Sequence, residues 1–134
     1  MNWYVLFIRS GMEEKIRDFF LSQGLQAFIP KMKVVFRKQG ISELVEKTMF
    51  PGYLFIESEL GQVAMDERIK ELRQQKTGIV KLLKFDKEGT PALRSEEKEY
   101  LERLLGKNKV LEHSTGLIQG NQVIITARLR IADR

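Results

Sequence analysis

The residues best suited to bind a ligand are cations gathered in one segment of the chain. Between residues 68 and 87, seven lysines and arginines stand against two acids, an excess equal to the +5 net charge of the whole sequence. Concentrated positive charge attracts phosphate groups, so this segment has the electrostatic footprint of a nucleic-acid-binding surface. The cations closest in sequence to Gly78, which we predict as nucleic-acid contacts, are Arg73, Lys76, Lys81 and Lys84. For Arg68 and Lys70 we favour a solvated helix face.

Groups that could perform catalysis form no recognisable arrangement. The chain has no cysteine and a single histidine, His113, which argues against thiolate metal sites and histidine clusters. It also lacks a phosphate-binding glycine loop, a nucleophile elbow and an HExxH motif. Acid pairs at 13–14 and 96–97 fall at predicted helix starts, where the helix dipole favours carboxylates. We therefore predict a binding protein that is not an enzyme and uses no metal or cofactor.

Length and composition are those of one ordinary domain with a short extra segment. The 134 residues are 43% hydrophobic, enough for a genuine core. No apolar run reaches the length of a membrane span, and the first residues do not resemble a signal peptide. A calculated pI near 9.5 favours an anionic partner. From these features we expect a cytoplasmic monomer that does not bind membranes.

An aromatic strand follows a turn signal in the segment 48–58. Pro51 and Gly52 have the residue types of the two central positions of a type II turn. In the strand that follows, Tyr53 and Phe55 point to one side, and the next residues, Leu54 and Ile56, point to the other. Because both sides are apolar, each needs a cover. We expect the protein's own helices to cover one side and leave the other for a partner.

The first half of the chain predicts a strand, a helix and a long hairpin. The run from Trp3 to Ile8 is typical of a buried strand, and Ser10 to Glu13 has the spacing of a capping box for a helix that ends near Gln23. Residues 26–38 have β character interrupted by Pro30, which indicates a sheet edge or a bend. We interpret the polar residues 39–47 as the hairpin tip and place the return strand from Met49 onward.

The second half predicts a helix over residues 62–75, a strand over 79–85, a loop over 86–91 and a helix from Ser95. The packing face of this last helix comprises Tyr100, Leu101, Leu104 and Leu105. A β-α-β-β-α-β order followed by a helix predicts an α+β protein with a ferredoxin-like antiparallel sheet.

The motifs WYVLFIRSGMEEKI and FPGYLFIE, in this order, resemble the N-terminal (NGN) domain of the NusG family of transcription elongation factors. The resemblance covers residues 1 to about 105, and we place the NGN domain at 1–106. It makes 107–119 a linker, and GNQVIIT at 120–126 resembles the start of that family's KOW domain, so that 120–134 would be a truncated start of it. The first strand and the basic profile are most similar to specialised paralogues, including LoaP-type processive antiterminators.

This resemblance implies a factor that acts in transcription elongation or antitermination. Family members bind RNA polymerase at the clamp helices of its largest subunit, and their NGN domain passes near RNA or DNA of the transcription complex. The matching positions for polymerase contact are Phe7, Phe50, Tyr53 and Phe55. Clustered aromatic rings make good interface anchors, but for each ring ordinary core packing is an equally good interpretation.

An RNA-binding domain of the RRM type is the alternative. It shares the predicted element order, and GYLFI resembles the aromatic strand on which such domains stack bases. Pro51 and Leu54 depart from the basic, glycine-aromatic pattern expected there. The two interpretations differ in whether nucleic acid meets the aromatic strand or the cations around Gly78.

Overall fold

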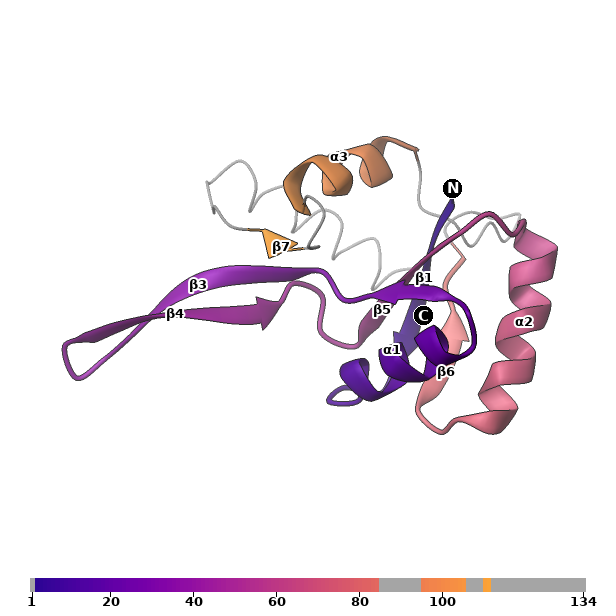
Figure 1. The fold of residues 1–134 in the computed structure, drawn as a ribbon, viewed down its shortest axis with the longest axis horizontal. Coiled ribbons are helices and arrows are strands. Elements are labelled where there is room, and N and C mark those ends of the chain that lie inside the picture. Colours follow the sequence, from indigo (N-terminus) through magenta and orange to yellow (C-terminus); the bar gives the residue numbers. More distant parts are fainter. Residues whose placement is uncertain (1, 85–94, 106–109, 112–134) are drawn as a thin grey trace.

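The computed structural model describes residues 2–84, 95–105 and 110–111, and a four-stranded sheet forms its centre (Figure 1). Its strands are β1 (Asn2–Ile8), β2 (Gln26–Phe28), β5 (Tyr53–Ser58) and β6 (Ile79–Leu82). They lie in the order β2, β5, β1, β6, and all neighbours are antiparallel. With the insertion between β2 and β5 set aside, this is the ferredoxin-like order, and it confirms the predicted α+β fold class.

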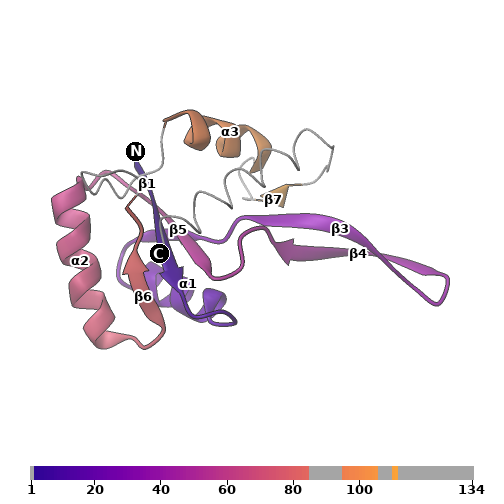
Figure 2. The ribbon, with the colours of Figure 1, turned by 180° about the vertical axis from the view of Figure 1, so that it is seen from behind.

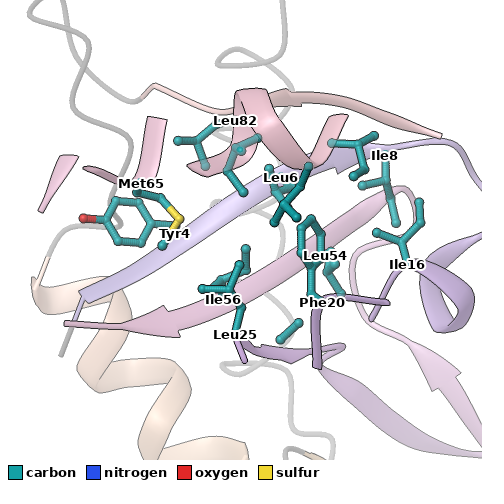
Figure 3. Close-up of a cluster of buried hydrophobic side chains, with 14 of the residues drawn as sticks. Tyr4, Leu6, Ile8, Ile16, Phe20, Leu25, Leu54, Ile56, Met65 and Leu82 are labelled. Atoms are coloured by element: carbon teal, nitrogen blue, oxygen red, sulfur yellow. The ribbon is translucent and has the colours of Figure 1, made fainter. Parts of the chain in front are cut away.

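Two helices cover one face of this sheet. They are α1 (Glu13–Ser22) and α2 (Gln62–Gln75), and their buried residues include Ile16, Phe20 and Met65. These side chains pack on the side chains of β1 and β5 that point to the same face (Figure 3). The sheet side of this cluster includes Tyr4, Leu6, Leu54 and Ile56. The alternation of side chains expected for these strands is therefore confirmed.

The opposite face is covered by a third helix, α3 (Ser95–Leu105), which lies across the sheet from α1 and α2 (Figures 1 and 2). Leu101 and Leu105 are buried there, and Tyr100 is partly buried. Their partners on the sheet and its loops include Trp3, Val5, Phe50, Tyr53 and Phe55. The face that we expected to be left for a partner thus has a cover within the chain.

The segment between β2 and β5 forms a ribbon of two strands, β3 (Lys31–Lys38) and β4 (Ile41–Thr48), which projects from the body (Figure 1). Gln39 and Gly40 connect them, with φ of 54° and 79°, as a type I′ turn requires. The prediction of a loop over 39–47 is therefore wrong, and the return strand of this hairpin is β4. Most of β4 is exposed, so it lacks the one-sided apolar pattern that marks a strand.

A second, three-stranded sheet has the order β4, β3, β7. The chain passes from β2 to this sheet at Ile29 and Pro30, which fits both the edge position and the bend predicted from Pro30. Strand β7 (Val110–Leu111), which lies within the segment predicted as a linker, pairs in parallel with the start of β3.

The predicted loop 86–91, His113 and the KOW-like start at 120–134 lie outside the described residues. The proposed domain boundaries stay predictions. Among the described helices, none is long and apolar enough to cross a membrane.

Candidate functional site

The Pro51-Gly52 turn is built as the sequence predicts. Its backbone N–H of Tyr53 donates to the carbonyl of Phe50 over 3.1 Å, and Gly52 has a φ of 87°. This combination defines a type II turn. The carbonyl of Gly52 accepts a hydrogen bond of 2.8 Å from the N–H of Ile8, so the turn is fastened to the end of β1.

Glu13 holds the same turn from the other side. Its carboxylate accepts the N–H of Gly52 at 3.2 Å and the N–H of Gly11 at 3.1 Å. The capping box predicted for Ser10 and Glu13 is therefore wrong, because α1 has Met12 as its N-cap and no side-chain capping bond. Glu13 does reach back to an orphan amide, as in a capping box, but it also connects α1 to a turn about forty residues further on.

The four aromatic residues predicted to contact polymerase lie in one cluster, in two different environments. Phe50, Tyr53 and Phe55 are buried, and Phe7 is half-buried. The rings of Phe50 and Phe55 lie 5.6 Å apart, and those of Phe7 and Tyr53 lie 5.7 Å apart. Three rings thus serve as core beneath α3, while Phe7 also presents part of its ring to solvent. Their role in binding a partner stays a prediction.

Lys81 lies beside Phe7. The two residues are direct cross-strand partners of β6 and β1, so their side chains share one face of the sheet. The pairing shifts between Phe7 and Ile8, and Val80 is the extra residue of this bulge. Lys81 therefore belongs to the surface around Phe7.

Two other predicted cations line a shallow hollow of about 650 Å³ around the turn from α2 to β6. They are Arg73 and Lys76, and Lys70 joins them, together with polar groups such as Thr77. No acidic side chain lines this hollow among the described residues. Such a surface can hold phosphate groups through side chains. The carbonyl end of α2 itself favours cations, which also explains Arg73.

The fourth cation has an internal partner. Lys84 forms an ion pair of 3.5 Å with Asp66 of α2. Arg68, which we expected to be a surface residue without a ligand, donates to the carbonyl of Gln23 and pairs with Glu71. The four predicted cations therefore occupy three places: the hollow, the surface beside Phe7 and the ion pair with Asp66.

The end of β1 joins the two candidate surfaces. While the N–H of Ile8 donates to Gly52, the N–H of the next residue, Arg9, donates to the carbonyl of Gly78 over 2.8 Å. The start of α1 also meets both turns, because Glu13 bonds Gly52 and the Met12 side chain fills the space above Gly78. The Pro51-Gly52 turn and the turn at Gly78 are thus held side by side.

Comparison with known proteins decides the family. Residues 1–102 match the sequence model described as transcription termination factor nusG. The chain belongs to the NusG family. It is 30% identical to the transcription termination/antitermination protein NusG of Thermus thermophilus, across 95% of this chain and 76% of that protein. The proteins of the same name from Chlamydia pneumoniae and Chlamydia trachomatis are 29% and 27% identical, each across 98% of this chain and 71% of the relative.

The NusG membership confirms the family that the opening motifs predicted. These relatives carry the general NusG name, so the LoaP-type subgroup stays a prediction. The RRM alternative is weakened, because Trp3, Tyr53 and Phe55, which would have to stack bases, are buried on the face covered by α3, and of the rings of β1 and β5 on this face Phe7 alone is half-buried.

Two features of this candidate site were not predicted from the sequence. Glu13 was assigned to the helix dipole, and its contact with Gly52 could not be found from local spacing. Lys70 was assigned to solvent, yet it lines the hollow with Arg73. Their three-residue spacing on a helix places both on one face, and that signal could have grouped them.

Proposed function

We propose that this chain acts in transcription elongation or antitermination by binding RNA polymerase through the surface around Phe7 and nucleic acid through the hollow around Gly78. The observation that supports this most directly is the attachment of both turns to consecutive residues, Ile8 and Arg9, at the end of β1. One rigid edge of the domain then presents an aromatic contact and a cationic contact together.

In the aromatic cluster, one ring would contact the polymerase and the buried rings would hold it in place. Phe7 is the ring with accessible area, and it packs on Tyr53, which is buried. A ring that is held by a rigid neighbour loses little freedom on binding and makes a good anchor. Family resemblance points to the clamp helices of the largest polymerase subunit as the partner surface. Phe50 and Phe55 would act by keeping the turn in place.

The polymerase contact is tested by comparing two half-buried phenylalanines. Phe7→Ala should weaken binding to RNA polymerase by about tenfold or more, as for an interface anchor. Phe19→Ala is the matched control, since Phe19 is also half-buried but packs on the cluster beneath α1 and α2. Binding is measured by interferometry on immobilised polymerase, and stability by urea unfolding. Equal affinities of the two variants at equal folded fractions would refute the assignment.

The nucleic-acid contact is tested with charge-neutralising pairs. The double variant Arg73→Gln with Lys76→Gln should bind RNA or DNA more weakly and with a smaller salt dependence. The reason is that fewer phosphate contacts form, so fewer counterions are released on binding. Lys84→Gln is the control, since Lys84 already pairs with Asp66. An unchanged salt slope in the double variant would exclude the hollow as a phosphate-binding surface. Loss of RNA binding in Phe7→Ala alone would instead revive base stacking on the aromatic strand.

A further inference from the structure

Among the described residues, no strand pairs with the outer edge of β4 on the projecting ribbon. Within the described residues β4 pairs with β3 alone, and in both views β7 lies along the side of β3 (Figures 1 and 2). The strand has eight residues, so it presents a full row of backbone donors and acceptors. Such an edge can template the addition of another strand.

The geometry of the hairpin determines which backbone groups face outward. In a two-residue hairpin the flanking pair, here Lys38 and Ile41, exchanges both backbone hydrogen bonds, and the direction then alternates along each strand. The bond of 2.9 Å from the N–H of Met49 to the carbonyl of Pro30 fits this alternation. The residues of β4 whose N–H and C=O groups point away from β3 are therefore Ser42, Leu44, Glu46 and Thr48.

We propose that β4 pairs in antiparallel fashion with β4 of a second copy of this chain, about a twofold axis at Val45. In this register the outward backbone N–H and C=O groups of one copy face those of the other, since Leu44 lies opposite Glu46 of the second copy. It also places Glu43 directly opposite Lys47, twice by symmetry. Opposite charges in directly facing positions stabilise an antiparallel pair.

Other registers lose this match. A slip of one residue sets outward groups against inward ones, which breaks the ladder. A slip of two residues places either Glu46 opposite Glu46 or Glu43 opposite Val45. Charged residues on a sheet edge usually prevent unwanted strand pairing. Here the charges of β4 repel in one neighbouring register, form no ion pair in the other, and attract in the register centred on Val45. The charge pattern of β4 is thus self-complementary at the register centred on Val45.

Exposed apolar side chains add to this edge. Val35 and Leu44 are cross-strand partners on one face of the ribbon, and each is 62% exposed. In the proposed register the Leu44 side chains of the two copies become diagonal neighbours, with Val35 behind each. The continuous sheet formed by the two copies would therefore carry an apolar strip across its four ribbon strands, which a single ribbon leaves in solvent.

Charge exchange tests the register in solution. Glu43→Lys and Lys47→Glu should each weaken self-association by about tenfold or more, because both symmetric contacts become repulsive. An equimolar mixture of the two variants should associate again, as should the double variant that carries both changes. Glu67→Lys on α2 is the control for the change in net charge, and sedimentation velocity over a range of concentrations gives the constants. A wild-type chain that stays monomeric at millimolar concentration, or a mixture that does not associate, would overturn the proposal.

A disulfide provides the second test. Because the chain contains no cysteine, Val45→Cys introduces one thiol, which would face its own copy across the twofold axis. Facing residues of adjacent strands have Cα separations that suit a disulfide. Lys47→Cys is the control, since it would face Glu43. Rapid dimer formation by Val45→Cys but not by Lys47→Cys is expected on mild oxidation, and equal rates would refute the register.

Discussion

Glu13 gives the sharpest test of the structural reasoning, because Glu14 beside it offers a matched control. Both glutamates lie in the first turn of α1, so both lose the same favourable interaction with the helix dipole when they are replaced by alanine. Glu13 is half-buried and accepts the amides of Gly11 and Gly52, whereas Glu14 is exposed and pairs with Lys31 at 3.1 Å. The difference between the two variants therefore isolates the two backbone hydrogen bonds.

The expected difference follows from the two kinds of contact. A hydrogen bond to a charged group contributes about 1.5–3 kcal/mol, and the partial exposure of Glu13 lowers the contribution of its two bonds to about 2 kcal/mol together. A surface ion pair such as Glu14–Lys31 contributes about 0.5 kcal/mol. Glu13→Ala should thus lower the free energy of unfolding by about 1.5 kcal/mol more than Glu14→Ala does, which corresponds to roughly 5 °C in the thermal midpoint of unfolding. The assay is urea unfolding with m-values compared, and costs within 0.5 kcal/mol of each other would refute the role of Glu13.

Two further predictions concern Gly78 and Tyr4. Both Gly78 and Gly24 have positive φ, but a Cβ at Gly78 would lie 2.8 Å from the Met12 sulfur, whereas Gly24 has open space. Gly78→Ala should therefore cost about 0.5 kcal/mol more than Gly24→Ala in urea unfolding, because the flexible end of Met12 has to shift. Equal costs would contradict this packing. Burial raises the pKa of Tyr4, whose hydroxyl donates to the carbonyl of Leu60 over 2.6 Å. The neutral hydroxyl therefore stabilises the folded state fully below the ordinary pKa of 10.0, and this stabilisation is lost as pH rises through the higher pKa of the folded state. Unfolding free energies from pH 8 to 11 should fall less steeply in Tyr4→Phe than in wild type, and parallel curves would argue against it.

Local signals were enough to predict the central sheet. The continuous apolar runs of β1 and β5 and the helical spacing of Met65, Ile69 and Leu72 led to correct elements, because these segments pack on a core. The Pro51-Gly52 turn was also predictable, since its conformation is set by those two residue types. The ribbon was not, because β4 is mostly exposed and its strand conformation depends on pairing with β3.

The site was harder to predict than the fold. Sequence spacing placed four cations near Gly78, but the strand direction of β6 turns Lys81 toward Phe7, and Asp66 pairs with Lys84 from α2. Sequence distance reports neither relation. The same limit applies to the aromatic residues, since the burial of Phe50 and Phe55 depends on α3, about fifty residues further along the chain.

The attachment of two turns to Ile8 and Arg9 has a consequence for how binding at one turn affects the other. Consecutive Cα atoms are about 3.8 Å apart, and a peptide unit cannot stretch, so the two residues to which the turns are hydrogen-bonded keep a constant separation. In the proposed function, polymerase docked at Phe7 therefore holds the hollow at a constant offset from the enzyme. Nucleic acid that runs past this point meets the cations at a high effective concentration, and individually weak phosphate contacts become sufficient. Such a domain needs no tight nucleic-acid affinity of its own, and its grip on the nucleic acid ends when the polymerase contact is released.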